Sequence, residues 1–280
     1  MLGNTEPRET GSVPERVGSE WPLYAAVYEE ILRLIAEGVY PVGSQLVGEP
    51  EFAKQLGVSR VVLREAIRAL EVDGILIKRA GIGTFVNEPY PVIESSLTTN
   101  YGMTEIIESG GLEAGTSSIS ITDEILDPKL AGRLDQPNGS WVRKIERVRT
   151  AAGRPVALTV DYLPVVTCRT SCKELGEGGS LYDLLESWGI CVKYGYARLI
   201  PTKAGHHLGK ALGISAESIV LLIEQVDCDA DGHVVMFSEE YHIRTAFRFL
   251  VRRVRGNLEG VQTSSDGVLV EADGDHLRDW

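Results

Sequence analysis

Three arginines recur at intervals of four in the segment LGVSRVVLREAIRAL, residues 56–70: Arg60, Arg64 and Arg68. Residues four apart lie on one face of an α-helix, so their guanidinium groups would form a single stripe. Arginine suits phosphate groups and guanine edges, which it can bind through two parallel hydrogen bonds. A solvated helix face, with ion pairs to acidic residues in neighbouring turns, is the alternative interpretation.

The elements around these arginines decide between the two interpretations. Ser59 is a good N-cap for a helix that ends near Gly74, and Gly57 ends a shorter helix over residues 49–56. An apolar face of the second helix can pack against a core: Val62, Ala66, Ile67 and Leu70. Two short helices joined by a glycine-containing turn are typical of a helix-turn-helix, which leaves the arginine stripe exposed to a ligand.

The segment ILIKRAGIGTFV, residues 75–86, predicts a β-hairpin with Lys78, Arg79 and Gly81 at its tip. Its glycines could simply make a tight turn, but the adjacent basic residues favour contact with phosphates. We therefore expect a winged helix-turn-helix DNA-binding domain over residues 21–86. Its second helix would enter the major groove of double-stranded DNA, and its wing would contact phosphates or the minor groove.

The charge balance of the whole chain is acidic, with 40 acidic and 28 basic side chains in 280 residues and a net charge of −12. This excludes a protein that coats nucleic acid by bulk charge, although residues 54–79 hold six basic and three acidic residues. Six acidic residues against Arg278 alone make residues 256–280 a predicted acidic disordered tail. Residues 1–20 are predicted to be a disordered N-terminal tail. They lack the apolar stretch of a signal peptide, and no apolar run is long enough to span a membrane, so a cytoplasmic protein is expected.

Catalytic and metal-binding patterns are missing from the sequence. The four cysteines are too sparse for a disulfide framework and lack the double-pair spacing of a zinc site: Cys168, Cys172, Cys191 and Cys228. We find no nucleophile motif, no metal-ligand cluster and no phosphate loop. We therefore expect no catalytic residue, no metal and no cofactor.

A second domain is expected over residues 96–255, after a proline-containing linker at residues 87–95. Residues 92–140 have no clear pattern. Further on, WVRKIERVRT and PVALTVDYL flank the turn AAGR, and two helices and three strands follow: helices 180–188 and 203–212, strands 191–200, 219–227 and 233–243. This order predicts an α+β domain with an antiparallel sheet and flanking helices.

Two sets of segments resemble known families. PLYAAVYEEILRLIAEGVYPVGSQL, LGVSRVVLREAIRALEVDGIL and GIGTFV resemble the DNA-binding domain of GntR-type bacterial transcription regulators. ERVRTAAGRPVALTVDYLP, GSLYDLLESWGI and VDCDADGHVVMFSEEYH are similar to the UTRA effector-binding domain of the HutC subfamily, whose fold is like that of chorismate lyase. The resemblance implies a homodimeric repressor that binds a pseudo-palindromic operator and responds to a small-molecule effector.

The DNA contacts that the resemblance implies are Ser59, Arg60, Arg64 and Gly81. We add Arg68, Lys78 and Arg79 by their position alone. The family usually has Pro-Ser-Glu-Arg where this chain has Val-Gly-Glu-Pro at residues 47–50, so a capping serine and a DNA-contacting arginine are missing. An altered operator sequence is expected, with the same mode of binding.

The effector-binding residues that the resemblance implies are Arg147, Arg149, Ser180 and Tyr241. The two arginines alternate on one strand and share a face, and Ser180 begins a helix whose N-terminus attracts anions. Thr159 stands where relatives often carry a glutamate for sugar recognition, and a second acidic position falls near Val235. These departures favour an effector other than an amino-sugar phosphate, with an anionic group as the expected feature.

Two other functions fit parts of the sequence. One is a regulator that binds DNA constitutively and whose effector pocket is vestigial, because of the two missing acidic positions. The other is a lyase-type enzyme with an accessory winged helix, which the missing catalytic motifs disfavour. We therefore expect a regulator and not an enzyme.

Overall fold

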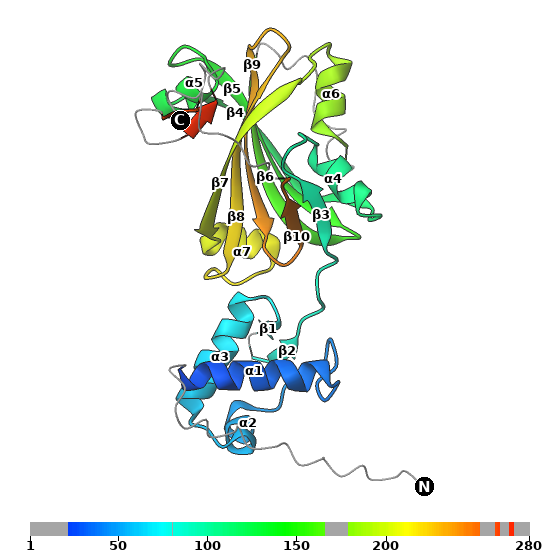
Figure 1. The fold of residues 1–280 in the computed structure, drawn as a ribbon, viewed down its shortest axis with the longest axis vertical. Coiled ribbons are helices and arrows are strands. Elements are labelled where there is room, and N and C mark those ends of the chain that lie inside the picture. Colours follow the sequence, from blue (N-terminus) through cyan, green and yellow to red (C-terminus); the bar gives the residue numbers. More distant parts are fainter. Residues whose placement is uncertain (1–21, 80, 166–178, 253–260, 264–268, 272–280) are drawn as a thin grey trace. The chain divides into compact units, whose positions relative to one another are not determined.

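The computed structural model describes residues 22–79, 81–165, 179–252, 261–263 and 269–271. The chain divides into two compact units (Figure 1). The first comprises residues 1–90 with residues 203–219, and the second comprises residues 91–202 with residues 220–280. No helix in the described part of the chain is long and apolar enough to cross a membrane.

Three helices form the core of the first unit: α1 (Leu23–Ala36), α2 (Glu49–Leu56) and α3 (Arg60–Val72). Each has an apolar face that packs into one cluster, because its apolar residues recur at helical spacing. The residues of α3 in this cluster are all shielded from solvent: Leu63, Ala66, Ile67 and Leu70. Val62, which we expected on this face, is only partly buried.

The turn between α2 and α3 follows the predicted chemistry. Gly57 ends α2 with φ +69°, a left-handed conformation that glycine adopts without strain. The Ser59 side chain then accepts a hydrogen bond from the backbone N–H of Val62 and caps α3. The helix-turn-helix is therefore confirmed. Its second helix, α3, ends at Val72.

The wing consists of β1 (Leu76–Arg79) and β2 (Gly83–Val86), which pair antiparallel with Arg79 opposite Gly83. Leu76 and Val86, at the base, are 2% exposed and join the core of the first unit. The base of the hairpin is thus fixed by apolar packing, and the tip extends into solvent. This confirms the expected wing at residues 75–86.

A six-stranded antiparallel sheet dominates the second unit, in the order β4-β5-β6-β9-β8-β7. Its strands are β4 (Ala114–Ile125), β5 (Trp141–Ala151), β6 (Arg154–Pro164), β7 (Tyr194–Lys203), β8 (Ile219–Cys228) and β9 (Val234–Ile243). The hairpins β5–β6 and β8–β9 are those expected from the sequence. The strand expected at residues 191–200 begins three residues later.

Helices pack on opposite faces of this sheet (Figure 1). On one face lies α6 (Leu181–Ser187), which packs against Ile145 of β5 and Met236 of β9. On the other lies α5 (Pro128–Arg133), which packs near Val142 and Phe237. The two faces use alternate residues of the same strands, as the period of two in a β-strand requires. The α+β architecture with an antiparallel sheet is confirmed.

The region that the sequence left unassigned, residues 92–140, contains β3 (Ile93–Ser96), α4 (Met103–Ser109), β4 and α5. Strand β3 pairs in parallel with β10 (Phe247–Leu250), which is more than 150 residues away in sequence. The short α7 (Gly205–Leu212) corresponds to the helix expected at residues 203–212.

Parts of the remaining expectations fall outside the described residues. Within the expected acidic tail, two short strands pair antiparallel: β11 (Val261–Thr263) and β12 (Leu269–Glu271). Cys191 and Cys228 are free thiols, the first exposed and the second buried. The N-terminal segment 1–20, Cys168 and Cys172 lie outside the described residues.

Candidate nucleic-acid interface and effector cavity

The outer face of α3 is polar and open to solvent. Arg60, Arg64 and Arg68 are all exposed on it, and the side chains of Arg64 and Arg68 keep 60% and 71% of their accessible surface. Ser59 is exposed at the N-terminus of the same helix. A further residue, Val61, is 74% exposed in the first turn and was not expected at this face. The sequence could have predicted this position, because Val61 and Arg64 are three residues apart and such residues are neighbours on a helix surface.

Arg64 is oriented by an acidic residue of the preceding helix. Its Nε donates a hydrogen bond of 2.6 Å to Oε2 of Glu49, which is the first residue of α2. Charge-assisted bonds of this kind are stronger than neutral ones, although exposure to water weakens this pair. Glu49 is part of the Val-Gly-Glu-Pro stretch that departs from the family pattern. Glu49, the one residue that this stretch shares with the family pattern, therefore positions Arg64, a predicted DNA-contacting residue.

The wing tip carries the other predicted contacts. Lys78 and Arg79 are exposed at the end of β1, and Gly81 is exposed in the turn with φ +73°. The guanidinium carbon of Arg79 lies 4.6 Å from the ring centroid of Phe85, a cation–π contact that holds the side chain along the wing. The wing therefore presents two cations at the end of a fixed hairpin.

Gln45 anchors this tip to the rest of the unit. Its Nε2 donates a 2.9 Å hydrogen bond to the backbone oxygen of Ile82. Gly83 lies against the same side chain: a Cβ on Gly83 would collide with the Gln45 amide. Gly83 also has φ +149°, which L-residues rarely adopt. Sequence reasoning missed Gln45 because the contact joins residues 37 apart.

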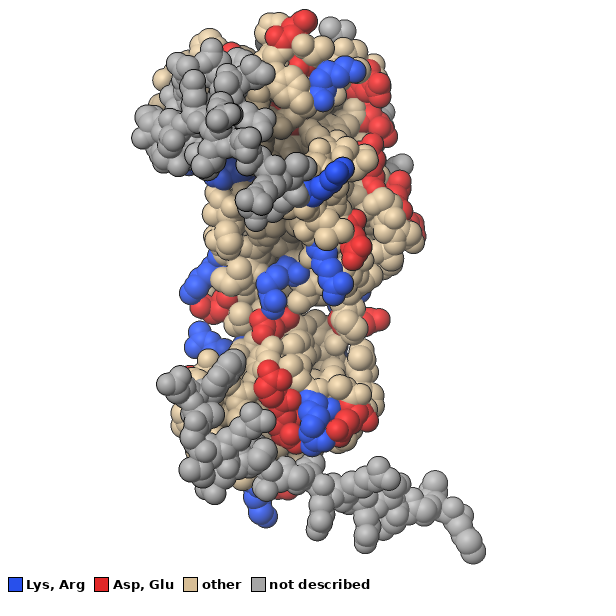
Figure 2. Space-filling view, viewed as in Figure 1, with Lys and Arg blue, Asp and Glu red and all other residues tan. Residues whose placement is uncertain are grey.

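The charges over α1 differ from those on α3. Figure 2 looks onto α1 and shows acidic and basic side chains side by side over that helix. Arg33 of α1 pairs there with Glu30 at 2.6 Å and with Glu37 at 2.7 Å. Arg33 thus has two acidic partners within its own helix, whereas the wing presents Lys78 and Arg79 at an exposed tip.

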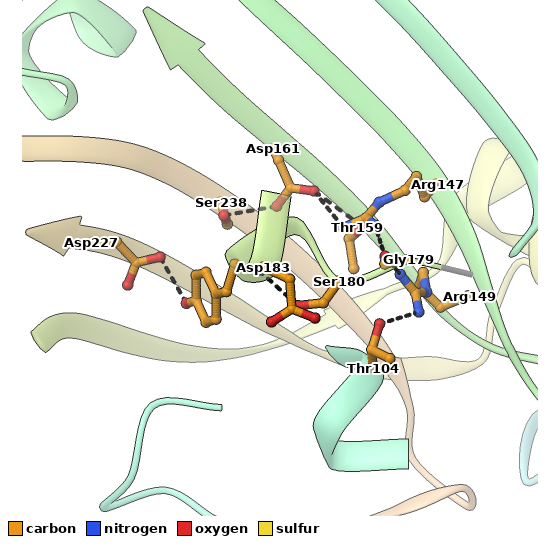
Figure 3. Close-up of polar contacts among 11 residues, drawn as sticks. Thr104, Arg147, Arg149, Thr159, Asp161, Gly179, Ser180, Asp183, Asp227 and Ser238 are labelled. Atoms are coloured by element: carbon orange, nitrogen blue, oxygen red, sulfur yellow. Dashed lines mark hydrogen bonds and ion pairs between the residues drawn. The ribbon is translucent and has the colours of Figure 1, made fainter. Parts of the chain in front are cut away.

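In the second unit, polar side chains from three strands converge on a small cavity beside α4 and α6 (Figure 3). The lining residues are Gly102, Met103, Thr104, Arg147, Arg149, Thr159, Asp161, Leu181, Tyr182, Met236, Ser238 and Glu240. On β5, β6 and β9 these positions alternate, and cross-strand partners share a face. The sheet therefore presents one polar row toward the two helices.

Two buried arginines dominate this cavity. Arg147 is 3% exposed and Arg149 is 1% exposed. Both donate to the backbone oxygen of Gly179, at 3.2 Å and 3.4 Å, and Arg149 also donates to Oγ1 of Thr104 at 2.8 Å. Burial lowers the pKa of Arg149 to about 10, and the adjacent charge of Arg147 adds to this effect. The cavity therefore contains two adjacent guanidinium cations.

Two acidic side chains accompany the arginines. Asp161 accepts from Arg147 at 3.2 Å and from Oγ of Ser238 at 2.9 Å. Burial raises the pKa of Asp161, and the charge of Arg147 opposes that rise. Glu240 of β9 lines the same cavity. Asp161 and Glu240 thus place two acidic side chains in this cavity, at positions other than Thr159 and Val235.

Of the other expected effector residues, only Thr159 lines the cavity. Its hydroxyl is 3.5 Å from Asp161. Ser180 caps α6 by accepting from the backbone N–H of Asp183, next to the lining residue Leu181. Tyr241 lies on the opposite face of β9, where its hydroxyl is 3.4 Å from Glu239. The structure therefore brings Arg147, Arg149 and Thr159 together, with Ser180 at the edge, and does not bring Tyr241 to them.

A buried polar network adjoins the cavity through Tyr182. Asp227, which is 0% exposed, accepts from Tyr182 Oη at 2.9 Å, from Asn100 Nδ2 at 2.8 Å and from Gln225 Nε2 at 2.8 Å. Burial raises the pKa of Asp227 to about 7 against these hydrogen bonds. The network ties the segment before α4 and the first turn of α6 to β8. None of its members was expected from the sequence.

The cavity has a volume of about 20 Å³, enough for about one water molecule. Sites for small organic ligands usually have volumes of roughly 300 Å³ or more. A metabolite can therefore enter only if the elements around the arginines move apart.

Comparison with known families gives two matches in this chain. Residues 23–86 match bacterial regulatory proteins of the gntR family, and residues 109–248 match the UTRA domain. The first match contains α3 and the wing, and the second contains the strands that line the cavity. The two matched regions therefore correspond to the two candidate sites.

Similar individual proteins include the HTH-type transcriptional repressor NagR of Bacillus subtilis, which is 30% identical over 210 residues, 73% of this chain and 83% of the relative. A histidine utilization repressor of Pseudomonas aeruginosa is 34% identical over 43% of this chain and 48% of its own length. The crystal structure of PhnF from Mycobacterium smegmatis is 26% identical, with a TM-score of 0.55, and the match covers 82% of this chain and all of that one. Since these matches span both units, the chain belongs to the GntR family of bacterial transcription regulators that carry a UTRA domain, and not to a family of enzymes.

Proposed function

We propose that this chain is a homodimeric bacterial repressor that binds a pseudo-palindromic operator in the cytoplasm and releases it when an anionic metabolite enters the cavity of its UTRA domain. One observation carries the DNA-binding part. Helix α3 buries Leu63, Ile67 and Leu70 and exposes Arg60 and Arg64, with a basic wing in the same unit. An exposed helix of this kind can enter a major groove while its other face remains packed.

Each exposed group has a role set by its chemistry. The Nε bond from Arg64 to Glu49 fixes the direction of the guanidinium, whose terminal nitrogens can then donate to O6 and N7 of a guanine. Arg60 and Ser59, in the first turn, are placed for bases or phosphates. Lys78, Arg79 and the Gly81 backbone would bind phosphates beside the groove, and Arg68 would bind a phosphate from further along α3.

The effector part rests on the two buried arginines. Arg147 and Arg149 present adjacent positive charges that an anionic group can neutralise. Asp161, Thr159 and Glu240 can accept hydrogen bonds from hydroxyl or amine groups of the same molecule. An effector with both an anionic group and hydrogen-bond donors therefore fits this site. It must bind the released state more tightly than the operator-bound state by several kcal/mol to act as an inducer.

Substitution of Arg64 tests the DNA-binding part of the proposal. Operator fragments are first selected from genomic DNA on the purified protein, and affinities are then measured by fluorescence anisotropy at fixed salt. We expect Arg64→Ala to weaken operator binding by about 1 to 3 kcal/mol, the usual worth of a bidentate base contact. Arg33→Ala is the matched control, because Arg33 is also an exposed helical arginine paired with glutamate. Equal affinity of Arg64→Ala and the unmodified protein would remove Arg64 from the interface.

A thermal-shift screen tests the effector part. Sugar phosphates, histidine breakdown products and aromatic acids are compared, because a ligand that binds only the folded state raises the melting temperature by mass action. Compounds that bind should release operator DNA in the anisotropy assay and should lose their effect in Arg149→Met. A binder whose effect survives that substitution would place the effector outside this cavity.

A further inference from the structure

A buried histidine lies directly behind the cavity. His242 of β9 is 1% exposed, and its Nε2 is 3.1 Å from Oε2 of Glu240, which lines the cavity. The two residues are two positions apart on one strand and so share a face. Glu240 thus has the cavity on one side and the imidazole of His242 on the other.

Two phenylalanines of β10 hold the other side of this imidazole. Its centroid is 4.7 Å from that of Phe247 and 5.0 Å from that of Phe249, with interplanar angles of 81° and 85°. The two phenyl rings are stacked with their centroids 5.8 Å apart and an interplanar angle of 4°. Edge-to-face contacts of this type fix the relative position of the rings. A shift of the imidazole would therefore displace the aromatic pair of β10.

Strand β10 in turn holds β3, which begins at Ile93, inside the linker expected at residues 87–95. Residues 87–92 are therefore the linker in the structure. The parallel register places Phe247 beside Ile93 and Phe249 beside Ser95. The backbone N–H of Ile93 donates a hydrogen bond to the backbone oxygen of Ala246 at 2.8 Å. The backbone N–H of Leu97 likewise donates to the backbone oxygen of Leu250 at 3.0 Å. Ile93 is completely buried. The position of β10 therefore determines where the chain leaves the linker and enters the second unit.

The chemistry of His242 indicates more than space filling. A hydrocarbon side chain would fill a site against two stacked phenyl rings without desolvating polar atoms, whereas Nδ1 of His242 is buried with no hydrogen-bond partner among the described residues. The contact with Glu240 therefore accounts for the imidazole's orientation. Glu240 also interacts electrostatically with Arg149. Its carboxylate therefore lies where a charge that enters the cavity can act on it.

We propose that the Glu240–His242 pair is the link through which the state of the effector cavity reaches β10, β3 and the linker. The proposal rests on the proposed effector site. An anionic group at Arg149 repels the Glu240 carboxylate and takes its place as counter-charge. The carboxylate turns away, the imidazole loses its hydrogen bond, and the aromatic contacts that hold β10 to β3 shift. His242 is a positioning residue here, because it does not line the cavity.

Amide hydrogen exchange on the full chain tests this link without a known effector. Glu240→Ala and His242→Leu each remove the bond from one side, and each should speed exchange in peptides covering residues 93–97 and 247–250 by about tenfold through local opening. The double variant should show no further increase, because both changes break the same link. Glu240→Gln and His242→Gln can each restore a hydrogen bond and should exchange like the unmodified protein. His233→Leu, at an exposed histidine of the β8–β9 turn, is the matched control.

Operator affinity provides a readout that a purely structural role would not move. Glu240→Ala should change the operator dissociation constant at least about fivefold when His242 is present and should leave it unchanged in the His242→Leu background. Unchanged exchange at residues 93–97 in Glu240→Ala, additive effects in the double variant, or no rescue by the glutamine variants would each overturn the link. A general loss of folding is recognised by faster exchange in β5 and β6 as well. The exchange readout needs neither DNA nor effector, so failure of the proposed function is distinguished from failure of this link.

Discussion

At the scale of single residues, the cavity is defined by charges that the fold has removed from water. Arg147 and Asp161 are 3% exposed each, and the pair persists because each supplies the charge that the other needs. The alternation of residues along β5 was enough to predict that Arg147 and Arg149 share a face. Asp161 follows Thr159 by two residues and could have been inferred in the same way. Glu240 could not, because its approach depends on the register between β6 and β9, which one sequence does not reveal.

The raised pKa of Asp227 predicts a pH-dependent stability. Burial raises this pKa to about 7, while an unfolded aspartate titrates near 3.9. Between these values the folded protein keeps a proton that the unfolded chain has lost, so the free energy of unfolding decreases as pH rises from about 4 to about 7. The effect amounts to a few kcal/mol at most, since one pKa unit corresponds to about 1.4 kcal/mol.

Asp227→Asn should remove this dependence. The amide oxygen can still accept from Asn100 and Gln225, and its nitrogen can donate to the Tyr182 oxygen. We expect a higher melting temperature than that of the unmodified protein at pH 8 and a much smaller difference at pH 5. Thermal unfolding followed by circular dichroism across this range measures both. Asp231→Asn, at an exposed residue of the same hairpin, should show no such trend, and a lower melting temperature for Asp227→Asn at pH 8 would contradict the assignment.

At the scale of elements, the winged helix-turn-helix was readable because its signals are local. A glycine turn, a serine cap and a glycine-containing hairpin each act over a few residues. The region from residue 92 to residue 140 was not readable for the opposite reason. Strand β3 pairs with β10 across the whole second unit, and β4 has mixed burial at the edge of the sheet. Such elements take their structure from distant partners and not from their own pattern.

The wing provides an element-scale prediction about DNA binding. Gly83→Ala should weaken operator affinity, because its Cβ collides with the Gln45 amide and breaks the bond from Gln45 to Ile82. A positive φ adds backbone strain of roughly 1 kcal/mol or more. Anisotropy titrations should show a loss of about tenfold, within the range expected when several phosphate contacts are weakened.

The double variant Gly83→Ala with Gln45→Ala separates the effect of the collision with the Gln45 side chain from that of backbone strain at residue 83. Removal of the Gln45 side chain relieves the collision, so the double variant should bind the operator better than the sum of the two single effects predicts. Chemical denaturation measures the stability of each protein in parallel. Strict additivity in operator binding would mean that Gln45 and Gly83 do not act on the same tip.

At the scale of the whole molecule, an acidic protein places its DNA-binding chemistry on a small part of its surface. The chain carries −12 overall, yet residues 54–79 hold six basic and three acidic side chains. One such surface would contact only a few phosphates and base pairs. Two copies related by two-fold symmetry would double the interface and require two half-sites in the operator. Composition and family resemblance could predict this organisation, but not the effector chemistry that controls it.

Half-site spacing tests the dimeric arrangement directly. The half-sites should lie about one helical turn, roughly 10 base pairs, apart or at a multiple of that distance. An insertion of about five base pairs turns one half-site to the opposite side of the duplex, so a two-fold dimer can engage only one half, and affinity should fall toward that of an isolated half-site. An insertion of about ten base pairs restores the phase but adds about 34 Å, so binding recovers only if the linkers at residues 87–92 can span the longer distance. Anisotropy titrations on the three duplexes, with a scrambled half-site as control, measure these differences. Equal affinities for all spacings would show that each subunit reads DNA alone, and control by the effector would then have to act within one chain.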